Sequence, residues 1–432
     1  MATSKVKNAE IKNAFYAQSG GVTSVINCSA AGVIEAVRKV PKKIGKLYAG
    51  RNGIIGALQE NLIDTSLESI EAIKALKHTP AGAFGSCRYK LKGIEQNKRE
   101  YERLIAVFKA HNIGYFFYNG GGDSADTCLK ISQISASLGY PLVAVHVPKT
   151  VDNDLPVTDC SPGFGSVAKY VAVSMLEAGL DVASMSATST KVFVLEVMGR
   201  HAGWITAACG LAQNTKAGMM APQILLLPEV TFDPKAFLKR VDEVVKRDGY
   251  CAIGVSEGIK NANGKFVSES GLVDAFGHAQ LGGVAPVITD LVRRELKLKC
   301  HWAVADYLQR AARHIASKTD VEQSYALGKA AVEYAVKGMN GVMPAVKRTS
   351  GTGSKPYTWE IVPAPLTSVA NVEKKMPRDF ITADGFHITQ KCRNYMQPLI
   401  EGEAYPPYEN GLPKYVKLQN KLIKKKLPKF DL

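Results

Sequence analysis

Two short polar segments contain the residue types that phosphoryl transfer requires. Residues 120–124 read Gly-Gly-Gly-Asp-Ser, and residues 148–154 read Pro-Lys-Thr-Val-Asp-Asn-Asp. Glycines let a backbone close around a phosphate, a lysine can neutralise phosphoryl charge, and a carboxylate can accept a proton from an attacking alcohol. Each segment follows an apolar run, 115–118 or 142–145, that predicts a strand. The pattern indicates a phosphoryl-transfer site at the ends of two strands.

A third turn, Ser19-Gly20-Gly21, follows the apolar run 14–17 and precedes an amphipathic helical pattern. Backbone N–H groups at such a turn, together with the helix dipole, favour an anion. One glycine turn alone could be purely structural, whereas two in one sheet favour phosphate binding. Neither loop has the Gly-Lys-Ser/Thr of a nucleotide P-loop or the spaced glycines of a dinucleotide fold. The predicted donor-binding residues are Gly20, Gly21, Gly121, Gly122, Asp123, Ser124 and Lys149.

Asp152 and Asp154 are two residues apart after a predicted strand. In an extended segment their side chains point the same way, so one could act as a base while the other orients cations or donors. Lys149 and Arg88 are candidates for the positive groups that stabilise the transferred phosphoryl oxygens. The alternative is an Asx turn with two solvated aspartates.

Weaker signals come later in the chain. The segments Met198-Gly199-Arg200 and Ser256-Glu257-Gly258 both end predicted strands, and a glutamate there could bind paired sugar hydroxyls. Residues 307–310 (Tyr-Leu-Gln-Arg) read as an amphipathic helical turn, in which Arg310 is most simply a surface residue.

Apolar runs alternate with helical periods through most of the 432 residues, which predicts an α/β fold with mainly parallel sheets. Ligands of such sheets bind beyond the carboxyl ends of the strands, where these loops fall. The chain is long enough for two or three domains, and no flexible linker divides it, so we expect packed lobes. The polar, Gly/Ser-rich segment 346–359 predicts a mobile loop, and 403–408 predicts an extended arm.

Composition narrows the class of protein. Hydrophobic residues make up 46% and charged residues 22%, as in globular proteins, and no apolar run is long enough for a membrane span. The polar N-terminus lacks a signal sequence, so a cytoplasmic location is expected. The eight cysteines form no Cys-x-x-Cys pair, which argues against zinc sites and disulfides.

The net charge of +16 comes in part from a lysine-rich amphipathic stretch at 414–429. Such a tail could be a solvated helix face, a subunit contact or a weak polyanion binder. No nucleic-acid-binding motif accompanies it, so a nucleic-acid partner is not expected.

Taken in order, these segments resemble the phosphofructokinase family from about residue 14 to about residue 315. The turn at 19–21 corresponds to the family's first phosphate loop. Gly85-Ser86-Cys87-Arg88 resembles the element whose arginine contacts the transferring phosphoryl group. Residues 148–154 resemble the family's Pro-x-Thr-Ile/Val-Asp-Asn-Asp motif. This resemblance implies that Asp152 is the base that deprotonates the 1-hydroxyl of fructose 6-phosphate, and that Thr150 binds the sugar phosphate.

The same resemblance implies a domain organisation. Two Rossmann-like three-layer lobes with mainly parallel sheets are expected. Residues 1–165 plus about 305–400 would form the phosphoryl-donor lobe, 166–304 the fructose 6-phosphate lobe, and 401–432 a C-terminal arm and basic tail.

The sugar-phosphate contacts are also implied by the resemblance. Residues 198–200 match the family's Met-Gly-Arg, and Tyr307-x-x-Arg310 matches the 6-phosphate motif of many pyrophosphate-using members. Residues 277–283 are similar to another 6-phosphate motif but have Leu281 in place of its arginine. Lys191 falls where a 6-phosphate arginine sits in nucleotide-using relatives, reaching a neighbouring subunit. The predicted substrate-binding residues are Thr150, Asp152, Asp154, Lys191, Met198, Gly199, Arg200, Glu257, Tyr307 and Arg310.

Two positions predict the donor. ATP-using members usually have glycines where this chain has Asp123 and Lys149. A carboxylate at Asp123 would repel a nucleotide's α-phosphate, at a cost of about 1–3 kcal/mol for an effective dielectric near 20. Pyrophosphate lacks that third phosphate, and Lys149 can stabilise its oxygens.

The expected reaction is reversible phosphoryl transfer from pyrophosphate to fructose 6-phosphate, giving fructose 1,6-bisphosphate and phosphate. The predicted catalytic residues are Asp152, Lys149, Asp123 and Arg88. The alternatives are an ATP-dependent 6-phosphofructokinase with an atypical donor loop and a catalytically silent phosphosugar-binding subunit. Other sugar phosphates, such as sedoheptulose 7-phosphate, stay open as substrates.

The resemblance also implies Mg²⁺ and an oligomer. Gly122 occupies the position of the family's metal-binding aspartate, so Asp123 or Asp152 would hold the ion, or Mg²⁺ would arrive bound to pyrophosphate and water. A homodimer or homotetramer is expected because the family's sites are often completed by an adjacent subunit. No duplicated half is visible, so non-allosteric kinetics are expected.

Overall fold

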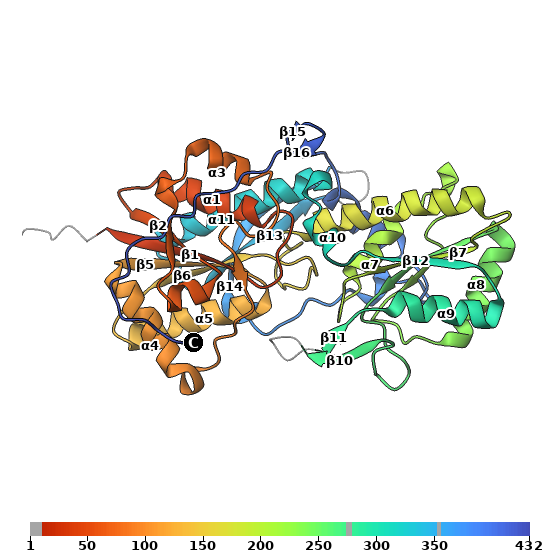
Figure 1. The fold of residues 1–432 in the computed structure, drawn as a ribbon, viewed down its shortest axis with the longest axis horizontal. Coiled ribbons are helices and arrows are strands. Elements are labelled where there is room, and N and C mark those ends of the chain that lie inside the picture. The colour runs from red at the N-terminus through yellow and green to blue at the C-terminus, as the bar shows by residue number, and fades with distance from the viewer. Residues whose placement is uncertain (1–10, 274–278, 352–355) are drawn as a thin grey trace, which may run out of the picture.

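The computed structural model describes residues 11–273, 279–351 and 356–432. They form two lobes, each with a sheet between layers of helices, and the longest axis of the molecule runs through both lobes (Figure 1). This arrangement confirms the expected pair of three-layer α/β lobes.

The first lobe contains an eight-stranded sheet in the order β14–β13–β6–β5–β1–β2–β3, with β4 paired to β1. The inner strands from β13 to β2 are parallel, and only the edge strands β14 and β3 run antiparallel. The strand bounds are β1 (Lys12–Ser19), β2 (Ile44–Gly50), β3 (Leu62–Asp64), β4 (Ser86–Cys87), β5 (Ile113–Gly120), β6 (Val143–Pro148), β13 (Val342–Ser350) and β14 (Thr358–Pro365).

Both faces of this sheet are covered by helices, which explains the nearly continuous apolar strands. In β1, Ala14 and Tyr16 face one core, whereas Phe15 and Ala17 face the other. The first core is completed by α1 (Ile26–Arg38), α3 (Ile70–Leu76) and α11 (Lys318–Val336). The second is completed by α2 (Ile54–Leu58), α4 (Ile94–Ala110) and α5 (Gly122–Ser137).

The second lobe contains a four-stranded parallel sheet in the order β12–β7–β9–β8. One face packs against α6 (Phe164–Met185), α7 (Trp204–Cys209) and α12 (Gln390–Met396), and the other against α8 (Pro234–Asp248) and α9 (Val284–Leu296). The strand bounds are β7 (Val192–Val197), β8 (Ile224–Leu226), β9 (Cys251–Ser256) and β12 (Cys300–Val304). A short ribbon, β10 (Glu269–Val273) with β11 (Ala279–Leu281), lies beside it.

The prediction of a mobile loop at 346–359 is wrong for both ends of that segment, which are strands. Strands β13 and β14 form an antiparallel hairpin in which Val346 pairs with Ile361 and Arg348 with Trp359. The Arg348 guanidinium donates to both oxygens of Asp159, 3.0 and 3.1 Å away, and so ties the hairpin to the body. Of these two strands, β14 lies at the sheet edge, where its polar side chains meet solvent. Residues 352–355 lie outside the described part of the chain.

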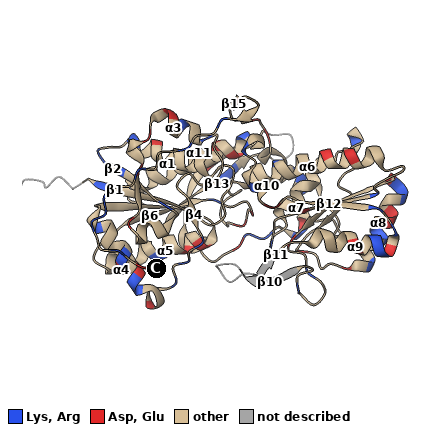
Figure 2. Ribbon diagram, viewed as in Figure 1, with Lys and Arg blue, Asp and Glu red and all other residues tan. Residues whose placement is uncertain are grey.

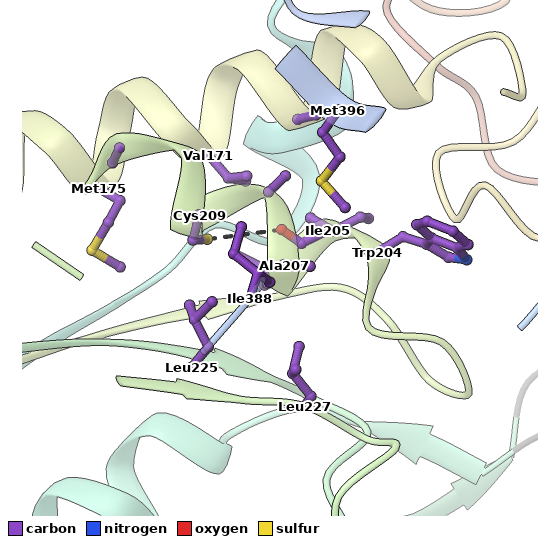
Figure 3. Close-up of a cluster of buried hydrophobic side chains, with 14 of the residues drawn as sticks. Val171, Met175, Trp204, Ile205, Ala207, Cys209, Leu225, Leu227, Ile388 and Met396 are labelled. Atoms are coloured by element: carbon purple, nitrogen blue, oxygen red, sulfur yellow. Dashed lines mark hydrogen bonds between the residues drawn. The ribbon is translucent and has the colours of Figure 1, made fainter. Parts of the chain in front are cut away.

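The C-terminal segment crosses between the lobes, unlike the predicted division. Residues 305–400 are predicted in the donor lobe, and α11, β13 and β14 do lie there. However, Ile388, Cys392 and Met396 are buried in the core of the second lobe. Figure 3 shows Ile388 and Met396 beside Ile205 of α7, where Cys209 Sγ donates to the Ile205 carbonyl. These three apolar side chains are buried against residues far away in the sequence, which places this part of the chain in the second lobe.

The lysine-rich tail is extended and docks on the first lobe of its own chain. Leu422 forms an antiparallel bridge with Ile63 beside β3, and Ile423 N donates to Leu62 O at 2.9 Å. The Glu60 carboxylate accepts from Lys426 N at 2.6 Å and from Leu427 N at 3.1 Å. Of the three alternatives for this tail, the solvated helix face is therefore wrong.

Residues of both charge signs are interspersed along the outer helices, as on α8 and α4 (Figure 2). In the part of the chain that the structure describes, no helix is long and apolar enough to cross a membrane.

Candidate active site

A cleft of about 1210 Å³ lies between the two lobes. Its wall is formed where β1, β5 and β6 end in the first lobe and where β7 and β9 end in the second. Sixteen of the predicted site residues line it: Gly20, Gly21, Arg88, Gly121, Gly122, Asp123, Ser124, Lys149, Thr150, Asp152, Asp154, Met198, Arg200, Glu257, Tyr307 and Arg310. The structure thus brings together segments that are more than 250 residues apart in the sequence.

The two glycine loops lie side by side at one end of this cleft. Gly20 has a φ of +73°, a conformation that glycine adopts without strain. A Cβ on Gly120 would lie 2.0 Å from Ser124 Oγ, so the start of α5 can pack there only against a glycine. Helix α5 begins at Gly122, and its first backbone N–H groups therefore lie at the cleft. This loop can hold an anion by hydrogen bonds and by the helix dipole.

Lys149 joins these loops. Its Nζ donates to the carbonyl oxygen of Gly21 at 2.6 Å, and its backbone N–H donates to Gly120 O at 2.9 Å. Burial lowers the pKa of Lys149 to about 8, with the cations Arg310 and Arg88 acting in the same direction. The ammonium is therefore desolvated and placed beside the predicted phosphate loops.

Asp152 has the properties of a general base. The Thr150 hydroxyl donates to Asp152 Oδ2 at 3.4 Å and accepts from Asp152 N at 3.1 Å, which orients the side chain. Burial, followed by the nearby charges of Asp154 and Glu257, raises the pKa of Asp152 to about 7. Both aspartates are half-buried, so the alternative of two solvated turn residues is wrong.

Asp154 is held by a segment that was not among the predicted site residues. Its backbone oxygen accepts from Lys374 N at 2.6 Å, and Lys374 Nζ donates to Asn153 Oδ1 at 3.0 Å. Burial raises the pKa of Asp154, and its Oδ1 atom is buried without a hydrogen-bond partner. The neighbouring residues Asn371, Val372, Glu373 and Lys375 line the cleft. Residues 371–375 contain no recognisable motif, and only the folding of the chain brings them to the cleft.

The second lobe contributes the opposite wall. Gly199 N donates to Glu257 Oε1 at 3.3 Å, and burial raises the pKa of Glu257. A Cβ on Gly258 would lie 2.2 Å from Arg200 O, so the loops after β7 and β9 pack backbone against backbone. Gly199 itself supports this wall without lining the cleft. His201, Leu281 and Asp306 also line it and were not predicted.

Arg310 is not the surface residue that its helical pattern suggested. It lies on α10 (Asp306–Ala311), and its guanidinium lies 3.8 Å from the centre of the Tyr307 ring. A Cβ on Gly21 would lie 2.6 Å from Arg310 Nη1, so the side chain reaches across to the first lobe.

Lys191 lies away from this chain's cleft. It immediately precedes β7, whereas Met198 immediately follows that strand, so the two residues lie at opposite edges of the sheet. Residues 277 and 278 of the other 6-phosphate-like motif lie outside the described part of the chain.

The predicted metal ligand Asp123 is paired with a cation. Its Oδ1 lies 2.7 Å from Nζ of Lys90, a residue outside the predicted site. Among the described residues, no group of three or more His, Cys, Asp or Glu side chains could hold a metal ion.

Phosphate loops, a desolvated lysine and a carboxylate of raised pKa meet at the carboxyl ends of parallel strands. This combination of fold and site defines an α/β phosphotransferase that acts on an alcohol. The sequence pattern described as Phosphofructokinase matches residues 13–335. The chain belongs to the phosphofructokinase family.

Relatives with established names point to the pyrophosphate-using branch. The chain is 68% identical to the pyrophosphate–fructose 6-phosphate 1-phosphotransferase of Methylococcus capsulatus over 96% of this chain and 98% of the relative. It is 65% identical to the solved pyrophosphate-dependent phosphofructokinase of Nitrosospira multiformis, with a TM-score of 0.90, and the match covers 98% and 100% of the two chains. It is 30% identical to ATP-dependent 6-phosphofructokinase 2 of Streptomyces coelicolor over 66% and 78% of the two chains.

Proposed function

We propose that this protein transfers a phosphoryl group from pyrophosphate to the 1-hydroxyl of fructose 6-phosphate, giving fructose 1,6-bisphosphate and phosphate in a reversible reaction. The observation that carries the donor assignment is the pair of Asp123 and Lys149 at the two loops of the first lobe. The high-identity relatives named above act on the same two substrates.

Asp152 accepts the proton of the attacking 1-hydroxyl. A carboxylate with a pKa near 7 is half ionised near neutral pH and binds a proton readily, which suits a general base. The hydrogen bonds to Thr150 hold it in place before the sugar arrives. The sugar hydroxyl, once deprotonated, attacks the terminal phosphorus of pyrophosphate.

Lys149 and Arg88 stabilise the charge that develops on the transferred oxygens, and the N–H groups at the start of α5 hold the remaining phosphate. Because these donors are positioned in the free protein, little reorganisation accompanies the reaction. Asp123 occupies the space beyond pyrophosphate, where a nucleotide's α-phosphate would meet a like charge.

Fructose 6-phosphate binds toward the second lobe. The Glu257 carboxylate accepts hydrogen bonds from sugar hydroxyls, and Thr150 and Arg200 contact the sugar phosphate. Tyr307 and Arg310 hold the 6-phosphate, which requires Arg310 to turn from Gly21 when substrate binds.

Lys191 belongs to the substrate site of a neighbouring subunit in this proposal, because it lies at the far edge of its own sheet. A homodimer or homotetramer follows from that role, and a cytoplasmic location stays a prediction.

Mg²⁺ fits the donor set at the cleft. The unpartnered Oδ1 of Asp154 is a free carboxylate oxygen, and Asp152 lies beside it. Asp154 would hold the ion together with pyrophosphate oxygens, which leaves Asp152 available to accept the proton, and Asp123 is less suited because its carboxylate is paired with Lys90. The ion would supply neutralisation of phosphate charge.

A donor assay tests the proposal. The purified protein should form fructose 1,6-bisphosphate from pyrophosphate and not from ATP, and the reverse reaction should release pyrophosphate. Turnover with ATP alone would establish the alternative of an ATP-dependent enzyme. No turnover with either donor, together with measurable binding of fructose 6-phosphate, would establish a silent phosphosugar-binding subunit.

A further inference from the structure

Lys90 contacts the donor-selecting carboxylate, although the mechanism above gives it no role. Its Nζ lies 2.7 Å from Asp123 Oδ1. Asp123 is in the first turn of α5, whereas Lys90 lies on the loop after β4, next to the cleft residues Arg88 and Tyr89. The ion pair therefore joins two walls of the donor end of the cleft.

The ion pair between Lys90 and Asp123 would reduce electrostatic repulsion between Asp123 and pyrophosphate. A carboxylate at Asp123 repels the α-phosphate of a nucleotide, but it also faces pyrophosphate, which carries several negative charges itself. Coulomb repulsion falls only as the inverse of distance, so an uncompensated charge at this position would weaken binding of the true donor. A lysine ammonium in direct contact turns the carboxylate into a dipole, whose field falls off faster, while leaving its bulk in place.

The other cations near the donor are less suited to this task. Lys149 Nζ instead donates a hydrogen bond to Gly21 O, 2.6 Å away. Among the ion pairs found in the described residues, Lys90 is the partner of Asp123.

The alternative is an ordinary surface ion pair. The Lys90 and Asp123 side chains are 43% and 38% exposed, and pairs of this kind contribute little to stability. Removing Lys90 should therefore leave folding unchanged in either case. Only the KM for pyrophosphate distinguishes an ordinary surface ion pair from a pair that sets donor affinity.

We propose that Lys90 is a positioning residue that sets donor affinity: it holds the Asp123 carboxylate at the rim of the cleft and cancels its charge toward pyrophosphate. This inference rests on the proposed function, because it assumes that pyrophosphate is the donor.

The test compares Lys90→Met, Lys90→Arg and Asp123→Asn with the double variant Lys90→Met/Asp123→Asn in the full-length protein. Lys90→Met should raise KM for pyrophosphate by about tenfold, with kcat and the KM for fructose 6-phosphate changed by less than about twofold. Lys90→Arg should restore the pyrophosphate KM. In the double variant, pyrophosphate KM should be at least about fivefold lower than in Lys90→Met, because no unpaired charge remains.

A control variant and a binding measurement separate a local effect of Lys90 from a general loss of positive charge. Lys92→Met removes an exposed lysine two residues further on that does not line the cleft, and it should change neither KM. The pyrophosphate concentration that protects each variant against thermal unfolding gives affinity independently of turnover.

An unchanged pyrophosphate KM in Lys90→Met would overturn the inference, as would effects of the two substitutions that simply multiply in the double variant. An equal loss for both substrates would show a structural role instead. The proposed function is judged separately, by whether the unsubstituted protein uses pyrophosphate; if it does not, this inference falls with it.

Discussion

The ammonium of Lys149 donates a hydrogen bond to the carbonyl oxygen of Gly21, 2.6 Å away. This contact joins the loop after β6 to the loop after β1, two strands that are separated in the sheet by β5. Because Lys149 is also buried, its charge is held at low local dielectric, where it interacts more strongly with phosphate oxygens than it would in water. The donor end of the cleft is therefore ordered before substrate binds.

The pH dependence should be bell-shaped. Burial raises the pKa of Asp152 to about 7, so kcat/KM should rise with pH as this base loses its proton. Burial lowers the pKa of Lys149 to about 8, so kcat/KM should fall above that pH as the ammonium is lost. Lys149→Arg should move the alkaline limb to higher pH, since a guanidinium stays charged. If the alkaline limb did not move, the ionisation behind it would belong to another residue or to pyrophosphate itself.

Asp152→Asn should remove the base while preserving the shape of the site. We expect kcat to fall by about 10²–10⁴-fold, with KM for fructose 6-phosphate changed by less than about threefold. Asp181→Asn, at an exposed aspartate on α6, is the matched control and should retain full turnover. Near-normal turnover in Asp152→Asn would place the base elsewhere.

Asp123→Gly combined with Lys149→Gly should change the donor. The double substitution removes both the charge that opposes an α-phosphate and the cation that stabilises pyrophosphate. We expect turnover with pyrophosphate to fall by at least about 10²-fold and turnover with ATP to become measurable. A donor preference identical to that of the unsubstituted protein would refute the role of this pair.

Two neighbouring glycines should respond differently to alanine. A Cβ at Gly120 would lie 2.0 Å from Ser124 Oγ and 3.2 Å from Ser19 Cβ, so Gly120→Ala must displace both phosphate loops. We expect a loss of about 1–3 kcal/mol in unfolding free energy and weaker binding of pyrophosphate. Gly122→Ala meets nothing within 4 Å and should keep the parent stability in thermal denaturation. Equal stability of the two variants would show that the loop adjusts freely.

Removal of residues 414–432 should destabilise the first lobe. The tail bridges to Ile63, and its backbone N–H groups donate to the buried Glu60 carboxylate, which also contacts His111 Nε2 at 2.7 Å. Loss of the hydrogen bonds from the tail to this carboxylate should cost about 1–3 kcal/mol, so the truncated protein should unfold at a lower temperature. Lys424→Gln removes an exposed charge of the same tail and should leave the unfolding temperature unchanged. An unaffected truncation would mean that the docked tail adds no stability.

The elements around the donor loops could be predicted from local patterns. The apolar runs at 115–118 and 142–145 lie within or overlap β5 and β6, and the run at 14–17 lies within β1. In this part of the sequence, short apolar runs, which form strands, alternate with amphipathic helical patterns. Both kinds of element are recognisable from the periodicity of neighbouring residues. Chemical motifs at their ends were predictable for the same reason, since a parallel sheet gathers all its carboxyl ends at one edge.

Segments without a local signature were not predictable. The polar residues of the hairpin β13–β14 are typical of a loop, those of the tail are compatible with a helix face, and residues 371–375 carry no motif at all. In each case the deciding interaction joins residues that are far apart: Lys374 to Asp154, Lys426 to Glu60 and Arg348 to Asp159. Their hydrogen bonds depend on which surfaces the fold brings together.

Residue types and their order were enough to predict the chemistry proposed for this protein: a carboxylate base, a lysine beside glycine loops and an aspartate that would disfavour nucleotides. Those properties depend on functional groups, which the sequence states directly. Only the tertiary structure decided that Arg310 reaches Gly21, that Lys90 pairs with Asp123 and that burial brings the pKa values of Asp152 and Lys149 close to neutrality. Distance and desolvation set these properties, and both arise only when the two lobes enclose the cleft.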